Sequence, residues 1–407
     1  MRILLLITNL GAGGAQRVFY DHALAFKEYF FVEEAVFNRD QDSRVYDSGL
    51  LLHDLQSQGF LSKMGRFGRL FSRSLALRRL VSRGKFDIVI SHMDGANWVN
   101  VLSCSAPRKI LVVHGTVLRD ENVSAVQQWF RRRLIFPLLY NSAERTVAVS
   151  QGIARELISV GRVRNVCSIP NFFDVQALSD KATRALDFAH ATIFKHPAVL
   201  VTSGRLVEQK KQSHLLEILA SLRARGRTVR LVILGDGQLR ESLIARCKAL
   251  GLRTFHAWGS DSKPTDDCDV YFLGYVPNPY QFLARSTLFL FPSAWEGFPL
   301  ALCEAMISRV PVLSADCPTG PREILAPGTL RDEYDLRIAE WAPSGVLLPV
   351  IESEQDLKIW IDAVETLLQD PLLRDRLRIN ATQAVRALDR GVVIARWLNL
   401  IHRVSHA

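Results

Sequence analysis

The segment FPSAWEGFPLALCEAM, residues 291–306, contains two glutamates, Glu296 and Glu304, with seven residues between them. The preceding run STLFLF predicts a buried strand, and PLALCEAM predicts the first turns of a buried helix. Both glutamates would then lie at the carboxyl end of a strand, where open α/β sheets bind their ligands. A carboxylate among apolar residues is costly unless it accepts hydrogen bonds, and paired ribose hydroxyls could donate them. Alternatively, protein donors satisfy Glu304, and Glu296 only favours the start of the helix.

Basic residues gather in a second segment, TSGRLVEQKKQSHLLEIL, residues 202–219. Arg205 follows the end of a predicted strand, and Lys210 and Lys211 would open the next helix. Lysines oppose the helix dipole at an N-terminus, so ordinary helix formation does not explain them. A diphosphate ligand would explain these basic residues, because arginine offers a planar pair of donors and lysine a point charge. An exposed cluster of charges is the alternative.

A glycine-rich loop, GAGGA at residues 11–15, stands between the first predicted strand and a helix that begins near Gln16. Gly13 and Gly14 would let the backbone approach a ligand, and the helix N-terminus favours an anion. The loop fits a dinucleotide fingerprint only in part, since Gln16 occupies the third glycine position and the second strand does not end in an acidic residue. A tight strand-to-helix turn is the plain alternative.

The elements that must position these residues are apolar strands alternating with helical patterns along the whole chain. Such strands predict parallel sheets that are covered on both faces, and their spacing predicts an α/β protein with two sheets. The expected boundaries are an N-terminal domain at 1–174, a linker region at 175–196, a second domain at 197–384 and a C-terminal helix at 385–407 that packs back on the first domain.

Composition narrows the partners of this chain of 407 residues. The net charge of +10 implies an anionic partner, but no nucleic-acid-binding module is recognisable, so we expect no nucleic acid. Six scattered cysteines indicate buried thiols in a reducing cytosol. Asp267-Cys268-Asp269 lies in a polar loop and is interpreted as a solvated acidic turn, so no metal site is expected.

Taken together, these segments resemble the retaining glycosyltransferases of glycosyltransferase family 4. The match covers nearly the whole chain: GAGGAQRV, VVHGT, AVSQGIARELI and IPNFFD in the first half, then GRLVEQK, LGDGQLRESL and the block FLGYVPNPYQFLARSTLFLFPSAWEGFPLALCEAM. The glutamate pair, together with the Gly-Arg-x5-Lys spacing, is the most specific part. The resemblance implies the GT-B fold, in which two Rossmann-like parallel-sheet domains face a central cleft.

The resemblance also implies residue roles. Arg205 and Lys210 would neutralise the donor diphosphate, although Lys211 competes with Lys210 for this role. Gly13 and Gly14 would approach the phosphates from the other domain. The transferred sugar would meet Glu296 and His114 as catalytic residues and the backbone at Phe298, Pro299 and Leu300, while Glu304 would hold the ribose. The stretch 327–344 looks like an insertion of unassigned role.

The implied activity is transfer of a sugar from a nucleotide-sugar, a UDP-sugar by analogy with a bacterial subgroup, to a glycan or lipid-linked acceptor with retention of configuration. No cofactor or metal would be required, because Arg and Lys neutralise the leaving group. The alternatives are a catalytically silent GT-B protein that binds sugar nucleotides or a partner, and a sugar-nucleotide epimerase. The expected location is cytoplasmic, peripheral on the cytoplasmic face of the inner membrane.

A basic segment at residues 60–85 suggests how the protein would reach such a membrane, since it holds no acidic residue. On a helix, Phe60, Met64, Phe67, Phe71 and Leu75 share one face, with Lys63, Arg66, Arg69 and Arg73 opposite. The sequence leaves two possibilities open. The helix either packs into the core with a solvated basic face, or it binds an anionic membrane surface.

Overall fold

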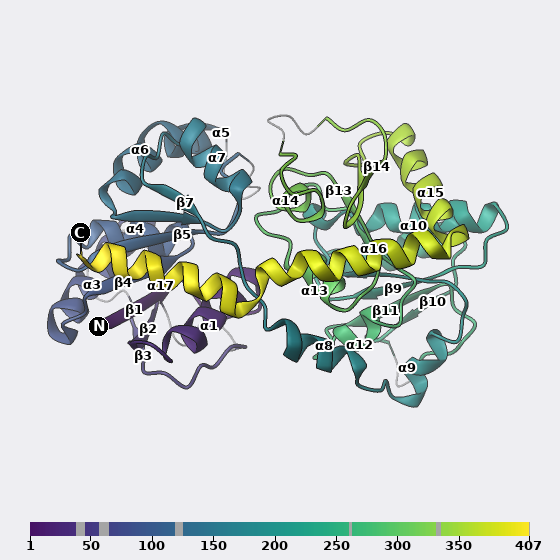
Figure 1. Cartoon of the computed structure of the whole chain (residues 1–407), viewed down its shortest axis with the longest axis horizontal. Helices are drawn as coiled ribbons and strands as arrows, with labels where there is room; N and C mark the ends of the chain where they lie inside the picture. Colours follow the sequence, from purple (N-terminus) through teal and green to yellow (C-terminus); the bar gives the residue numbers. More distant parts are fainter. Residues whose placement is uncertain (38–44, 57–64, 119–124, 260–262, 331–334, 407) are drawn as a thin grey trace. The chain divides into compact units, whose positions relative to one another are not determined.

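The computed structural model describes residues 1–37, 45–56, 65–118, 125–259, 263–330 and 335–406 (Figure 1). Contacts divide the chain into an N-terminal unit, Met1–Asn171 with Gly391–Ala407, and a C-terminal unit, Phe172–Arg390. Each unit has its own sheet and its own core. In the described ranges no helix combines the length and the apolarity needed to cross a membrane.

The N-terminal unit is built on a seven-stranded sheet with the order β3-β2-β1-β4-β5-β6-β7, in which every pairing is parallel. Its central strands are mostly aliphatic and almost entirely buried, as expected for strands covered on both faces. The strands are β1 (Arg2–Ile7), β2 (Phe31–Val36), β3 (Leu52–Asp54), β4 (Ile88–His92), β5 (Arg108–Val113), β6 (Arg145–Ala148) and β7 (Val166–Ser168).

Helices cover both faces of this sheet. Since β2 and β4 flank β1 on opposite sides, right-handed crossovers place α1 on one face and α3 and α4 on the other. The helices are α1 (Gly14–Phe26), α3 (Gly65–Gly84), α4 (Asp94–Leu102), α5 (Ala125–Phe130), the π-helix η1 (Arg131–Ile135), α6 (Phe136–Leu139), the 3-10 turn η2 (Tyr140–Ser142), α7 (Gln151–Ser159) and the C-terminal α17 (Arg390–His406).

The last helix, α17, packs against α1 in the N-terminal unit. The Trp397 ring lies 4.8 Å from His22 and 5.6 Å from Phe26, measured between centroids. Arg396 adds a hydrogen bond of 2.7 Å from its guanidinium to the Ser168 carbonyl at the end of β7. The far end of the sequence therefore completes the core that the first helix begins.

Helix α3 faces the sheet with a different side than the apolar stripe that the sequence emphasised. Leu77 and Val81 enter the core, whereas Phe67 and Phe71 are 86% and 60% exposed. Arg73, which was expected on the outer basic face, is half-buried with its guanidinium 4.4 Å above the Phe37 ring.

Two apolar stripes run along α3, and the sheet takes the one that contains Leu77. The expectation for Phe60, Lys63 and Met64 lies outside the described residues, as does the side chain of Arg66.

The C-terminal unit is built on an eight-stranded sheet with the order β10-β11-β9-β8-β12-β13-β15-β14. All pairings are parallel except that of β14 with β15. The strands are β8 (Val199–Ser203), β9 (Arg230–Leu234), β10 (Thr254–His256), β11 (Val270–Gly274), β12 (Leu288–Phe291), β13 (Val312–Ala315), β14 (Glu340–Ala342) and β15 (Gly345–Leu348).

The described part of the stretch 327–344 contributes the antiparallel edge strand β14. Its Glu340 carboxylate accepts hydrogen bonds of 3.0 and 2.9 Å from Arg322, whose guanidinium is buried and also binds Asp316. Fixing this buried charge is a structural role that the sequence did not reveal.

Helices of the C-terminal unit include two that form within the region expected to be a linker, 175–196. Side chains cap both, since Asp174 accepts from the Ala177 N–H and Asp187 from the His190 N–H. The helices are α8 (Val175–Thr183), α9 (Phe188–Ile193), η3 (a 3-10 turn, Glu208–Lys210), α10 (Gln212–Ala224), α11 (Arg240–Ala249), α12 (Tyr280–Leu283), α13 (Leu300–Ile307), α14 (Pro321–Leu325), α15 (Glu354–Gln369), α16 (Pro371–Ala384) and the 3-10 turn η4 (Val385–Leu388).

Candidate functional site

The predicted ligand-binding residues of the C-terminal unit follow the carboxyl ends of β8 and β12, which are neighbours in the sheet. Backbones come very close at this edge. A Cβ on Gly235 would overlap the Gly204 carbonyl, and one on Gly237 would overlap the Leu206 carbonyl. Both glycines are therefore needed for space, and they hold the loop after β9 against the loop that carries Arg205 and Lys210.

Lys210 and Glu296 form an ion pair at this edge. The Lys210 ammonium lies 2.5 Å from Glu296 Oε1, and the side chains are only 16% and 7% exposed. The same ammonium lies 5.0 Å from the centre of the Phe291 ring at the end of β12. A lysine ammonium has three donors, so pairing with Glu296 leaves capacity for a second anionic group.

Backbone bonds fix the two loops that carry this pair. The Ala294 N–H donates to the Gln209 carbonyl (2.9 Å), and the Gln209 amide donates to the Trp295 carbonyl (2.6 Å). On the other side, the Thr319 hydroxyl donates to the Glu296 carbonyl. Sequence reasoning missed Gln209 and Thr319, because bonds to main-chain carbonyls leave no recognisable spacing.

Lys211 is placed differently from Lys210. The chain makes the 3-10 turn η3 and then a left-handed residue at Lys211 (φ 52°), which is the N-cap of α10. The expectation that both lysines open one helix is therefore wrong, because the left-handed residue separates Lys210 from that helix. Lys210, and not Lys211, has its amine at Glu296.

Arg205 stands at the surface of the same loop, one residue after Gly204 (φ 155°). Its carbonyl accepts a hydrogen bond of 2.8 Å from the Gln212 amide, which anchors the backbone. Within the described part of the chain the guanidinium forms no hydrogen bond or ion pair. Arg205 can therefore offer its planar pair of donors to a ligand.

Glu304 lies in the second turn of α13, which begins at Leu300 with Pro299 as N-cap. Its Oε1 accepts a hydrogen bond of 3.1 Å from the hydroxyl of Tyr280, a buried residue of α12. A protein donor thus satisfies part of this carboxylate, as the alternative interpretation of the sequence allowed. A carboxylate accepts more than one bond, so ribose hydroxyls can still bind.

The backbone of the 298–300 turn is partly hydrogen-bonded within itself. The Leu300 N–H donates to the Phe298 carbonyl at 3.0 Å, so it is hydrogen-bonded within the turn. Pro299 is packed against Gly320 (φ 98°), where a Cβ would overlap the proline ring. Phe298 stays a candidate contact.

The Asp267-Cys268-Asp269 turn is not uniformly solvated, which corrects a second expectation. Asp269 is buried and accepts from the Arg223 guanidinium (2.6 Å) and from the Arg253 N–H (2.9 Å), whereas Asp267 is exposed. Asp269 therefore has a structural role. In the described part of the chain no group of three His, Cys, Asp or Glu is placed to hold a metal ion.

The N-terminal unit carries His114 directly after β5, with two further histidines behind it. His114 Nε2 lies 2.9 Å from His92 Nδ1, and His92 Nε2 lies 3.5 Å from His22 Nδ1. Burial lowers the pKa of His114 to about 4 and, with the charge of His114, that of His22 to about 3. The pKa of His92 is also well below its usual range, chiefly through burial. All three rings are neutral at pH 7.

The loop after His114 is held by a buried carboxylate of α7. Glu156 accepts from the Thr116 hydroxyl (2.8 Å) and the Val117 N–H (2.7 Å). Burial raises the pKa of Glu156, and these hydrogen bonds oppose the rise. The loop at His114 is thereby tied to the body of the unit.

Gly13 and Gly14 lie at the start of α1, with Gly13 as its N-cap. A Cβ on Gly13 would overlap the end of the Gln16 side chain, which donates 2.8 Å to Asn9 Oδ1. The Gly11 N–H donates to the same oxygen (3.2 Å). Gln16, which does not fit the dinucleotide fingerprint, thus stabilises the loop through its hydrogen bond to Asn9.

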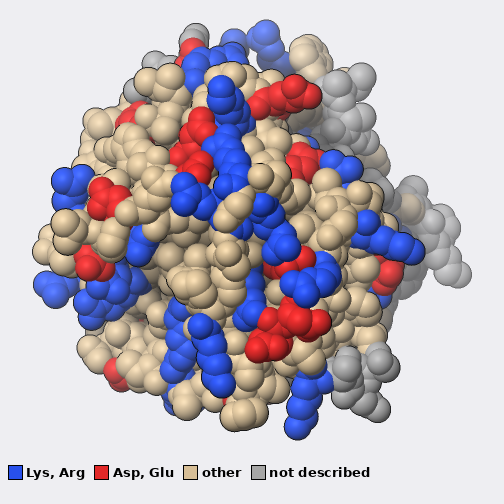
Figure 2. Space-filling view, turned by 90° about the vertical axis from the view of Figure 1, so that its right-hand side faces the viewer, with Lys and Arg blue, Asp and Glu red and all other residues tan. Residues whose placement is uncertain are grey.

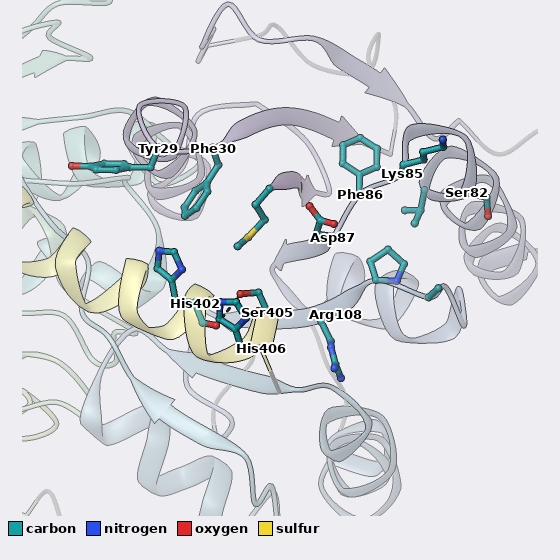
Figure 3. Close-up of a pocket in the computed structure, with 14 residues that line it drawn as sticks. Tyr29, Phe30, Ser82, Lys85, Phe86, Asp87, Arg108, His402, Ser405 and His406 are labelled. Carbon is teal, nitrogen blue, oxygen red and sulfur yellow. Dashed lines mark hydrogen bonds between the residues drawn. The ribbon is translucent and has the colours of Figure 1, made fainter.

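A pocket of about 850 Å³ lies away from these residues, at the amino ends of β1, β4 and β5. Figure 3 shows His402 and His406 of α17 on one side of it, with Phe30 and Asp87 among the other lining residues. Ligands of parallel sheets bind at the opposite, carboxyl edge, so this pocket is not part of the candidate site.

Comparisons with known proteins identify the family of the chain. A family model described as "Glycosyltransferase Family 4" matches residues 12–177, and one described as "Glycosyl transferases group 1" matches residues 183–384. An uncharacterized glycosyltransferase of Methanocaldococcus jannaschii is 27% identical over 359 residues, covering 82% of this chain and 83% of that protein.

A Campylobacter jejuni protein is 23% identical over 411 residues and covers 100% of both chains. Its name is GalNAc-alpha-(1->4)-GalNAc-alpha-(1->3)-diNAcBac-PP-undecaprenol alpha-1,4-N-acetyl-D-galactosaminyltransferase. Among solved structures, Anabaena HepE in complex with UDP and glucose has a TM-score of 0.75 at 19% identity and covers 99% of this chain and 100% of that one. At that identity the likeness concerns the fold alone.

The buried histidines predict a pH-dependent stability of the N-terminal unit. Because their folded pKa values lie below the usual 6.5, each takes up a proton on unfolding once the pH falls below that value. Their contribution is complete above about pH 6.5 and is lost as the pH falls toward 4, by at most about 1.4 kcal/mol per pH unit for each histidine. Urea unfolding at pH 7.5, 6.5 and 5.5 should show this slope.

The matched variants are His22→Phe and Phe26→Leu, because the rings of His22 and Phe26 stack on each other in the wild type. His22→Phe should lower the proton uptake on unfolding at pH 5.5 by about one. Phe26→Leu should change stability without changing that uptake. Equal slopes in wild type and His22→Phe would contradict the assignment.

Proposed function

Since the chain belongs to glycosyltransferase family 4 and has the GT-B fold, we propose that it transfers a sugar from a UDP-sugar to a glycan or lipid-linked acceptor with retention of configuration. The observation that carries the proposal is the largely buried Lys210–Glu296 pair, with the exposed Arg205 on the same loop as Lys210, at the carboxyl edge of the C-terminal sheet. The names of relatives favour the acceptor class, since the Campylobacter protein acts on a PP-undecaprenol glycan.

Charge explains why these residues suit the reaction. When the bond between a sugar and a nucleoside diphosphate breaks, positive charge develops on the sugar and negative charge on the diphosphate. Arg205 and Lys210 would stabilise the diphosphate, and removing one such fixed group typically costs about 3 kcal/mol. Glu296 would face the sugar while holding Lys210 in place, Glu304 would bind the ribose, and His114 would contact the reacting sugar from the N-terminal unit.

Two other functions use the same fold. A silent protein would bind the nucleotide-sugar without turnover, and an epimerase would convert it to an epimeric nucleotide-sugar without net release of nucleoside diphosphate. The decisive experiment incubates the protein with a panel of sugar nucleotides, with and without polyprenyl-diphosphate-linked glycans, and follows nucleoside diphosphate release. Acceptor-dependent release supports transfer. Binding without release supports one of the alternatives, and NMR of the recovered nucleotide-sugar then shows whether it is unchanged or epimerised.

We expect the product to keep the anomeric configuration of the donor sugar, and turnover to persist in saturating EDTA because protein cations neutralise the diphosphate. Proton NMR of the product gives the anomeric coupling, and EDTA-treated enzyme with and without added Mn²⁺ gives the metal dependence. An inverted anomer, or activity that EDTA abolishes and Mn²⁺ restores, would remove this mechanism.

Donor use should depend on Arg205, Lys210 and Glu304. Alanine at any of the three should lower kcat/KM for the nucleotide-sugar by tenfold or more, since a charged hydrogen-bond partner of the donor is lost (about 1.5–3 kcal/mol). Lys211→Ala is the matched control, because its amine is not the one at Glu296, and it should stay within about threefold of wild type. Normal donor affinity and turnover in Glu304→Ala would refute the ribose assignment.

We further propose that α3 holds the protein on an anionic membrane. Phe67, Phe71 and Leu75 are 86%, 60% and 38% exposed on one stripe of this helix. Among the described residues, Arg69 and Arg78 on the same helix form no ion pair. A helix that combines an exposed apolar stripe with unneutralised arginines suits the boundary between acyl chains and anionic headgroups.

The C-terminal unit differs in this respect, because many of its basic side chains are neutralised. In the face shown in Figure 2, Asp and Glu side chains lie beside many of the Lys and Arg side chains. Arg225 and Arg227, for example, bind Glu365 at 2.7 Å each, and Arg246 binds Glu217 at 2.8 Å. The net positive charge is therefore most available on elements such as α3.

Vesicle sedimentation tests the α3 proposal. Wild-type protein should bind vesicles containing phosphatidylglycerol and not pure phosphatidylcholine, with weaker binding at high salt because the attraction is screened. Arg69→Glu with Arg78→Glu should lower binding by tenfold or more, since each arginine contributes about 1 kcal/mol at such a surface. Phe67→Ser with Phe71→Ser should lower binding by tenfold or more as well, since the apolar stripe that enters the acyl chains is lost.

The control for charge is Arg376→Glu with Arg386→Glu, which reverses two exposed charges of the C-terminal unit. Binding should remain near wild type in this variant. Equal loss in the control and in the α3 pair would show that net charge, and not α3, governs the association.

A further inference from the structure

Three imidazoles lie in series inside the N-terminal unit, on three different elements. His22 comes from α1, His92 from the last residue of β4, and His114 from the loop after β5. His22 and His92 are 1% and 0% exposed, whereas His114 is half-buried. The series therefore runs from the core to the surface, and only its outer member can meet a substrate.

The link between His92 and His114 is an in-plane hydrogen bond. Their nitrogens are 2.9 Å apart, the ring centroids are 5.1 Å apart, and the planes differ by only 25°. Two rings whose centroids are so much farther apart than their nearest nitrogens lie edge to edge and not face to face. The N–H of one ring then points at the lone pair of the other, which is the geometry of a strong hydrogen bond.

The inner contact of the series, between His92 and His22, is longer and is packed between aromatic side chains. His92 and His22 are 3.5 Å apart at their nitrogens, with an angle of 62° between the rings. Phe19 packs edge-on against His92 (5.3 Å), and Trp397 of α17 packs edge-on against His22 (4.8 Å). These aromatic contacts leave the His92 ring little room to rotate or flip.

Neutral imidazoles have one N–H and one lone pair each. If His92 donates from Nδ1, His114 must accept at Nε2 and carry its proton on Nδ1. If His92 accepts, the His114 proton is on Nε2 and Nδ1 is a lone pair. In either case the His92 contact occupies His114 Nε2, so Nδ1 is the nitrogen left for a ligand, and the tautomer of His92 determines whether Nδ1 donates or accepts.

We propose that His92 is a positioning residue for sugar transfer, which holds His114 in one tautomer and turns its Nδ1 toward the reacting sugar. This inference rests on the proposed function, because the proposed function is what places His114 at the reacting sugar. It adds that the hydrogen-bonding character of His114 is set from inside the unit, by a residue that touches no substrate.

Two isosteres of His92 separate its two nitrogens. The amide of asparagine lies near the position of Nδ1, and that of glutamine near the position of Nε2. His92→Asn therefore keeps a partner for His114 and loses the one for His22, whereas His92→Gln does the reverse. His92→Leu removes both partners. Thermal unfolding of each variant shows which are folded, and the Asn and Gln pair suffices if the leucine variant is not.

The expected kinetic result is a change in kcat without a change in the KM for the nucleotide-sugar, since the donor-binding residues of the C-terminal unit are untouched. His92→Gln should lose about tenfold or more in kcat, within the range of acid–base contributions, while His92→Asn should retain most of it. His22→Phe should have a smaller effect than His92→Gln, because its link is longer. Equal kcat in the Asn and Gln variants would overturn the proposal.

Nitrogen-15 NMR of the imidazoles gives a test that needs no turnover. In the wild type, His114 should show one tautomer, with one nitrogen shift typical of N–H and one typical of a lone pair. In His92→Gln the two shifts should average toward each other as both tautomers become populated. Two averaged shifts in the wild type would refute the inference even for an active enzyme, whereas a single tautomer in a protein without transferase activity would keep the fixed tautomer of His114 and refute its role in sugar transfer.

Discussion

The ion pair between Lys210 and Glu296 is the interaction on which the candidate site depends. Two opposite charges are largely withdrawn from water here, and breaking such a pair is costly, so its geometry must be fixed. The loop that carries Lys210 and the loop that carries Glu296 are joined by the bonds of Gln209, and Thr319 holds the Glu296 carbonyl. An arriving diphosphate would meet a lysine whose position is already determined.

The sequence predicted the two parallel sheets and the strand ends at which the site residues lie, because those features follow from local patterns. Aliphatic runs such as β1 and β8 leave little doubt about burial, and a glutamate after an apolar strand must lie at its carboxyl end. The pair of Glu296 with Lys210 was not predicted. It depends on the left-handed backbone conformation of Lys211, and a lysine in the sequence does not indicate that conformation.

Other differences arise where two local patterns compete and tertiary contacts decide between them. Helix α3 has two apolar stripes, and the sheet selects Leu77 and Val81, so Phe67 remains outside. Tyr280 was not anticipated as the donor to Glu304, because its place depends on how α12 packs beside α13. His22 and His92 were also missed, since a histidine in an apolar strand or helix resembles any satisfied core residue.

The return of α17 to the N-terminal unit has a consequence for the order of events during synthesis. The chain leaves that unit after Asn171 and re-enters it at Gly391, and the two crossings are bonded side by side, with Phe173 and Arg390 joined at 2.8 Å. In the sequence, the C-terminal unit is thus an insertion within the N-terminal unit. It can fold on the ribosome before Trp397 of the N-terminal unit has been synthesised. The N-terminal core, in which Trp397 packs on His22 and Phe26, is completed only after the last helix has been translated.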